Sequence, residues 1–145
     1  MASRRKAREC ALQMLFQWDI GRNAPQTVQE LFWSEKGRPT DESLRTFANN
    51  LFTGAIRELE QIDRLLRAHA EHWRPERMPI VDRNILRLGI YELCHHPETP
   101  PAVVINEALE IARKFSGEEA VQFINGMLDH VSKELVARQG GNGCQ

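Results

Sequence analysis

The sequence of 145 residues contains no long apolar run, and no stretch approaches the eighteen or so apolar residues that cross a bilayer. It has only three cysteines, Cys10, Cys94 and Cys144, which lie far apart and form no Cys-x-x-Cys pair. This spacing indicates neither a disulfide framework nor a structural zinc site, and it favours a reducing compartment. The basic start of the chain is followed by charged and polar residues rather than the apolar core of a signal peptide. The sequence therefore predicts a cytoplasmic protein that does not associate with a membrane.

Motifs for catalysis and cofactor binding are also missing. The sequence has no Gly-x-Ser-x-Gly, no phosphate-binding glycine loop and no Gly-x-Gly-x-x-Gly after a strand. His69 and His72 would offer two nitrogens to a metal ion, but no third ligand is evident, so no metal site is predicted. Adjacent carboxylates such as Glu118 and Glu119 are typical of solvated helix ends. The sequence predicts a protein that is not an enzyme and uses no cofactor.

Signals for β-structure are weak, because alternating apolar and polar runs and hairpin turns between such runs are absent. The seven prolines all fall between segments of helical periodicity. We therefore expect an all-α fold with about seven helices in two packed helical bundles. The predicted single domain spans residues 1–137, with an N-terminal bundle at about 1–75 and a C-terminal bundle at about 76–137. The tail, 138–145, is polar and is expected to be disordered.

Apolar residues at helical spacing mark the expected helices. These are residues 3–20, a short helix after Pro25, 40–66 with a bend near 54–60, 80–94, 101–115 and 116–135. Gly21 is expected to end the first helix, and Thr40 or Asp41 to cap the third. A capping box from Ser116 to Glu119 is expected to open the last helix. The segment 80–94 is apolar on most sides, which predicts a central, buried helix.

The charge of the chain is unevenly distributed. The 19 Lys and Arg nearly balance 20 Asp and Glu, for a net charge of −1 that taken alone disfavours binding to nucleic acid. Four of the positive residues form an N-terminal basic cluster of Arg4, Arg5, Lys6 and Arg8. Without this cluster, 15 positive residues face 20 negative ones, a net charge of −5. The cluster can lie on a helix without entering its apolar stripe, and it is typical of phosphate binding; the alternative is a solvated terminus.

Two aromatic residues accompany these charges. Phe16 lies away from the apolar stripe of the first helix, on the same broad side as Arg5. An aromatic ring near arginines favours stacking on an unpaired base, whereas the alternative is packing against a second helix. Phe123, at the flank of the last helix, has the same two interpretations.

Four segments carry a resemblance to a known family: residues 5–19, 81–93, 104–108 and 123–129. They resemble, in order, the arginine-rich first helix, the central helix and the last two signatures of the transcription antitermination factor NusB family. Together they extend over residues 3–135. The resemblance implies an all-helical protein of two bundles that binds boxA-type single-stranded RNA of ribosomal operons together with the ribosomal protein NusE. It also implies that this complex joins RNA polymerase and suppresses termination.

The resemblance assigns roles to individual residues. The family's RNA-binding positions correspond to Arg4, Arg5, Lys6, Arg8, Phe16, Glu119 and Phe123. Glu119 falls where the family often has an acidic residue at the RNA edge. The region that meets NusE corresponds to Glu76 and Asp82. These roles are implied by the resemblance and not by residue spacing.

Two other functions stay open. A similar helical module forms the N-terminal RNA-binding domain of ribosomal RNA cytosine methyltransferases, so the chain would then be part of such an enzyme. The other alternative is a homodimer that hides its RNA surface, since some family members self-associate. A methyl-transfer assay would test the first alternative, and sedimentation with and without RNA would test the second.

Overall fold

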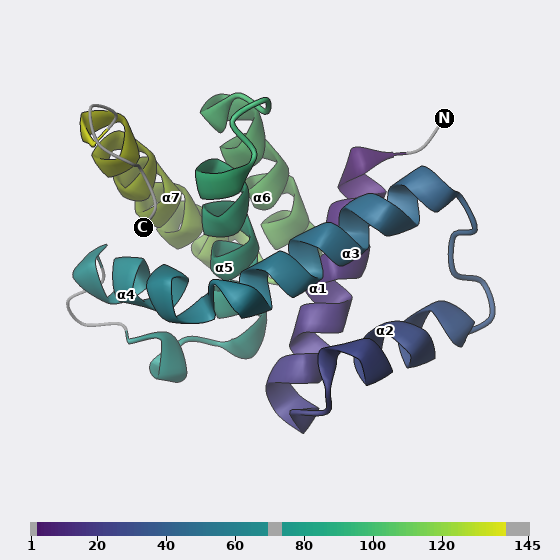
Figure 1. Ribbon diagram of the computed structural model, residues 1–145. Coiled ribbons are helices and arrows are strands. Elements are labelled where there is room, and N and C mark those ends of the chain that lie inside the picture. Colours follow the sequence, from purple (N-terminus) through teal and green to yellow (C-terminus); the bar gives the residue numbers. More distant parts are fainter. Residues whose placement is uncertain (1–2, 70–73, 139–145) are drawn as a thin grey trace.

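The computed structural model describes residues 3–69 and 74–138, and this part of the chain contains seven α-helices, one 3₁₀ turn and no strand (Figure 1). The elements are α1 (Arg4–Gly21), α2 (Pro25–Ser34), α3 (Glu42–Arg57), α4 (Leu59–His69), η1 (Pro75–Arg77), α5 (Ile80–His95), α6 (Pro101–Phe115) and α7 (Glu118–Ala137). The predicted all-α fold of about seven helices is confirmed.

Helix α5 lies at the centre of the molecule, between α1–α3 and α6–α7 (Figure 1). It contacts α1, α3, α4, α6 and α7, and every residue of the segment 84–92 is buried. The prediction of a central, buried helix is confirmed. Three of the buried residues, Asn84, Arg87 and Glu92, are nevertheless polar or charged, so they need partners inside the protein.

The helix boundaries follow from local capping and chain breaks. Ser3 Oγ accepts a hydrogen bond from the backbone N–H of Lys6, and Asp41 Oδ1 accepts one from Leu44 at 3.0 Å. Asp41 is thus the cap of α3. Glu58 alone is non-helical between α3 and α4, which confirms the interruption predicted near residues 54–60.

One predicted boundary is confirmed and one is wrong. Helix α1 ends at Gly21 as predicted, although the residue in the left-handed conformation is Arg22, at φ 57° and with its N–H bonded to the Trp18 carbonyl. Ser116 does not form a capping box, because its hydroxyl donates to Asp82 Oδ1 at 2.6 Å. Gly117, at φ 133°, precedes α7 without a side-chain cap, in a conformation that glycine adopts more readily than other residues.

Close packing of α3 on α5 depends on one glycine. A Cβ added at Gly54 would overlap the ring of Tyr91, so this position accepts no larger side chain without movement of α5. The contact fixes the distance between α3 and the central helix.

The helices form two neighbouring groups that share one apolar core. Helices α1, α2 and α3 pack together, as do α5, α6 and α7, while α4 contacts α3, α5 and α7. The boundary between the bundles at residues 75 and 76 stays a prediction, and the tail beyond residue 138 lies outside the described residues. Within the described ranges, none of the helices has the length and apolar character needed to span a membrane.

Candidate nucleic-acid interface

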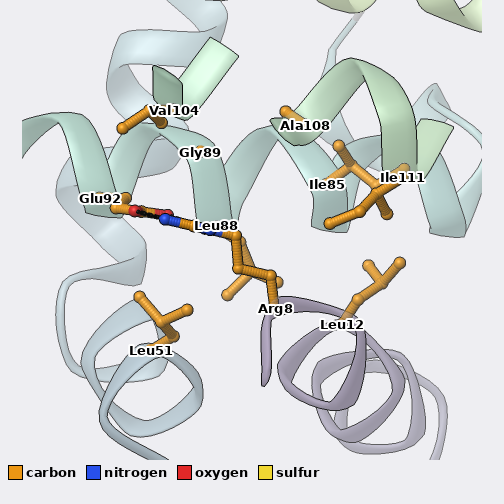
Figure 2. Close-up of a pocket in the computed structure, with 10 residues that line it drawn as sticks. All are labelled: Arg8, Leu12, Leu51, Ile85, Leu88, Gly89, Glu92, Val104, Ala108 and Ile111. Atoms are coloured by element: carbon orange, nitrogen blue, oxygen red, sulfur yellow. Dashed lines mark hydrogen bonds and ion pairs between the residues drawn. The ribbon is translucent and has the colours of Figure 1, made fainter. Parts of the chain in front are cut away.

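Arg8, in the N-terminal basic cluster, is buried and paired inside the protein. Its Nε donates to Glu92 Oε1 at 2.9 Å, and its Nη2 donates to the other carboxylate oxygen of Glu92 (Figure 2). This bidentate pair joins the start of α1 to the end of α5. The expectation that the whole cluster stays out of the apolar stripe is wrong for Arg8, because a buried carboxylate compensates its charge.

Arg5 lies one helical turn before Arg8 and is exposed. Its Nε and Nη2 donate to the two carboxylate oxygens of Glu107 on α6, at 2.9 and 2.7 Å. Glu107 also lies 3.7 Å from Nη1 of Arg8. The hydrogen bond from Arg5 lowers the pKa of Glu107, so this carboxylate is ionised at neutral pH.

The other two members of the cluster face different neighbours. The Arg4 guanidinium lies 3.9 Å from the centre of the Phe47 ring, a cation–π contact with α3. Lys6 Nζ lies 4.0 Å from Glu9, a buried carboxylate that also accepts a hydrogen bond from Lys114 Nζ at 3.0 Å. Glu9 therefore holds Lys114 of α6 beside α1, while 58% of the Lys114 side chain stays exposed.

Phe16 is half-buried and lines a cavity of about 410 Å³. Phe115 of α6 and Arg38 of the α2–α3 connection line the same cavity, and Arg38 is held there by a hydrogen bond from Nη1 to Gln13 at 2.9 Å. Gln13 itself also lines the cavity, as do Leu12, Gln17 and Val81. Two rings and a guanidinium from distant parts of the chain thus meet at one open cavity.

Phe123 lines a second cavity, of about 270 Å³, together with Glu119 and Asp82. Glu119 is exposed, whereas Asp82 is buried and bonded to Ser116. The structure therefore places Asp82, which the resemblance assigns to the partner region, beside two residues assigned to RNA. Glu76 lies outside this cavity lining, exposed on η1 and 3.8 Å from Arg67.

The two cavities flank the first turn of α5. Val81 lines the first and Asp82 the second, and the Ser116–Asp82 hydrogen bond ties the α6–α7 turn to this point. Together with Lys6 and Lys114, the cavities form what we call the cation–aromatic face. This face extends from α1 over α6 to the start of α7.

Sequence reasoning missed three residues of the cation–aromatic face: Arg38, Lys114 and Phe115. The adjacent cation and ring at positions 114 and 115 were a readable signal at the end of a predicted helix. Arg38 gave no such signal, because only tertiary packing brings it to Phe16.

A third cavity, of about 20 Å³, lies beside the Arg8–Glu92 pair and is lined mainly by apolar side chains such as Leu51 and Ile85 (Figure 2). Its size suits about one water molecule and no larger ligand. Across residues 3–69 and 74–138, no group of three or more potential metal-ligating side chains is present. His72 lies outside these residues.

A helical core around α5, with cations and aromatic rings gathered on one face, is the architecture of an all-α protein suited to a polyanionic, base-bearing ligand. The sequence matches the NusB family over residues 5–133. The chain belongs to the NusB family, which confirms the resemblance seen in its four motifs.

Individual relatives agree with this assignment. The chain is 54% identical over 137 residues to transcription antitermination protein NusB of Koribacter versatilis, covering 94% of this chain and 93% of that protein. It is similar to the structure of T. maritima NusB, with a TM-score of 0.83, 33% identity and coverage of 92% and 94% of the two chains. It is also similar to a chain in the crystal structure of antitermination factors NusB and NusE in complex with dsRNA. There the TM-score is 0.82 at 29% identity, with coverage of 90% and 96%.

Proposed function

We propose that this chain is a transcription antitermination factor that binds boxA-type single-stranded RNA of ribosomal operons together with NusE, and so helps RNA polymerase resist termination. The observation that carries the proposal is the cavity shared by Phe16, Phe115 and Arg38. Membership of the NusB family and similarity to a NusB–NusE–RNA complex support it. In this proposal the protein acts in the cytoplasm by binding, without catalysis.

The chemistry of the cation–aromatic face suits an unpaired strand. A splayed base can stack on the Phe16 or Phe115 ring, while Arg38 and Lys114 neutralise neighbouring phosphates. Phe123 offers a third ring at the second cavity. The rings then contribute base contacts, and the cations contribute affinity that does not depend on sequence.

Partner binding would add a second surface for the same strand. The proposal places NusE at Glu76 and at the Asp82 end of α5, beside the second cavity. Because the chain outside the N-terminal basic cluster has a net charge of −5, the protein alone offers only a small positively charged surface to RNA. A strand held by two modest surfaces at once binds more tightly than to either alone.

The proposal is tested by fluorescence anisotropy with a labelled boxA-type RNA and a scrambled RNA of the same composition. We expect the boxA-type RNA to bind more tightly, and NusE to widen the difference. Equal affinity for the two RNAs, with and without NusE, would rule out sequence-specific recognition. Sedimentation of the same samples tests the homodimer alternative, since RNA that dissociates a dimer would support a hidden surface.

Substitution of Phe16 tests the role of the ring itself. Phe16→Leu keeps apolar volume but removes the stacking surface, so affinity for the boxA-type RNA should fall about tenfold. Phe16→Tyr is the matched control and should bind within about twofold of the original chain, because it retains the ring. Equal binding by both variants would mean that Phe16 only packs against its neighbours.

A further inference from the structure

Four charged side chains alternate in sign from the surface to the interior. Arg5 pairs with Glu107, Glu107 approaches Arg8, and Arg8 pairs with Glu92. The exposed fraction of the side chain falls along this series, from 47% at Arg5 to 3% at Glu92. The two arginines of one helix face therefore have different environments, although they lie only one turn apart.

The two ion pairs differ in how easily they can open. The Arg5–Glu107 pair lies at the surface, where water and salt screen the attraction and a second anion can replace the carboxylate at small cost. Breaking the Arg8–Glu92 pair would leave a buried carboxylate without compensation. Only the outer pair can exchange its partner without disturbing the fold.

We infer that Glu107 competes with the RNA backbone for Arg5, so that Arg5 changes partner when RNA binds while Arg8 stays with Glu92. The inference rests on the proposed function. Glu107 occupies the Nε and Nη2 edge of Arg5, which is an edge that a phosphate would use for a bidentate contact. Because Arg8 lies 3.7 Å from Glu107, the carboxylate stays in place when Arg5 departs.

The competition lowers affinity for every RNA equally. A phosphate carries no sequence information, so an arginine released from Glu107 would bind boxA-type and scrambled RNA with the same gain. Glu107 therefore limits non-specific binding without changing the preference between sequences. This distinguishes it from Phe16, whose loss should change that preference.

The test measures the affinity of full-length Glu107→Gln for both RNAs over a range of salt concentrations. We expect both RNAs to bind about three- to fivefold more tightly, as befits the loss of an exposed ion pair. The gain should shrink as the salt concentration rises, because salt screens the Arg5–Glu107 pair with which the RNA backbone competes. Glu110→Gln, on the same helix but paired with Arg113, is the matched control and should change affinity by less than about twofold.

An Arg5→Gln background shows whether the effect passes through Arg5. There, Glu107→Gln should give no further gain. If Glu107→Gln still increases RNA affinity in this background, the carboxylate acts by general charge repulsion and not through Arg5, and the inference is overturned. Weaker binding by Glu107→Gln alone would also overturn it, because Glu107 would then orient Arg5 for RNA. Urea unfolding of Glu107→Gln should match the original chain, since Arg8 keeps its pair with Glu92.

The outcome is separable from that of the proposed function. If the original chain prefers boxA-type RNA but Glu107→Gln binds no more tightly, only the competition is wrong. If Glu107→Gln tightens binding to both RNAs and neither is preferred, the competition stands and the sequence-specific function fails. Absence of binding to either RNA at low salt would overturn both.

Discussion

Helices α1 and α5 run antiparallel, and both ends of this helix pair carry arginine–carboxylate contacts of different design. At one end Asp19 accepts hydrogen bonds from Arg83 at 2.7 Å and from Asn84 and Arg87 at 3.1 Å. Arg87 also forms a bidentate pair with Asp63 of α4, at 2.9 Å for each bond. We call this end the Asp19 network, and its members Asp19, Asp63, Asn84 and Arg87 are buried.

The opposite end contains the Arg8–Glu92 pair and continues outward through Glu107 to Arg5. Arginine–carboxylate pairs thus occur at both ends, but only the Arg8 end extends to an exposed arginine, Arg5. In the Asp19 network Asp19 and Arg87 each bond to two or more partners, and Arg87 holds both carboxylate oxygens of Asp63, so these charges are not available to a ligand. At the Arg8 end the outermost guanidinium, that of Arg5, is 47% exposed and has one carboxylate partner, Glu107. Exposure, and not residue type, separates a structural arginine from one that can bind a phosphate.

Arg87→Met should produce the largest effect, because Arg87 bridges two buried carboxylates, Asp19 and Asp63. Removing the guanidinium leaves two buried carboxylates without this cation. The loss of one member of a buried ion pair lowers the free energy of unfolding by about 3–5 kcal/mol. Urea unfolding followed by circular dichroism measures the loss. Arg64→Met, at an exposed arginine of α4, is the control and should leave the unfolding midpoint unchanged. Similar midpoints for both variants would mean that the network adds nothing to stability.

Arg8→Met should have the second largest effect. It leaves Glu92 buried at the end of α5, at a cost of about 3 kcal/mol, the lower end of the range for such losses. The cost is smaller than at Arg87 because only one carboxylate is fully buried here. The same unfolding assay applies. A stable Arg8→Met variant that binds RNA poorly would place Arg8 at the RNA and contradict its structural role.

Acid should weaken the two ends unequally. Burial alone would raise the pKa of Asp19, but the hydrogen bond from Arg83 and the charge of Arg87 outweigh it and lower this pKa. The lowered pKa adds stability above the ordinary value of 3.8, and this stability is lost as pH falls through the folded-state pKa. We therefore expect the free energy of unfolding, measured from pH 6 down to about pH 3, to depend less on pH in both variants than in the original chain. This reduction should be greater in Asp19→Asn than in Glu107→Gln. The reverse order would make the exposed end the acid-sensitive one.

Local patterns predicted most of the helices. Periodic apolar residues located α1 and α5, and the chain break at residues 37–39 limited the cap of α3 to Thr40 or Asp41, of which the structure selects Asp41. The predictions were wrong where a side chain bonds to a residue distant in the sequence. Ser116 donates a hydrogen bond to Asp82, and Arg8 donates to Glu92, which lies 84 residues away. No local pattern reports such a partner.

The residues of the candidate site likewise fall into those that local sequence patterns predict and those that only tertiary packing brings together. Phe16 could be found because its position departs from the apolar stripe of its own helix. Arg38 could not, because it reaches the cavity only through the packing of the α2–α3 connection on α1. The basic cluster was visible as a run of charge, yet its division into a buried Arg8 and an exposed Arg5 depends on carboxylates of α5 and α6.

Arg5→Met should have the smallest effect on stability, and it tests the comparison most directly. The Arg5–Glu107 pair is solvent-exposed, and Glu107 keeps Arg8 as a neighbour, so the urea midpoint should stay within error of the original chain. RNA affinity and its salt dependence should nevertheless fall, because one phosphate contact is lost. A matched Arg64→Met variant, at an exposed arginine of α4 that pairs with the exposed Glu60, should change neither property. A marked loss of stability in Arg5→Met would show that the outer pair is as structural as the Asp19 network, and the distinction between the two ends would no longer hold.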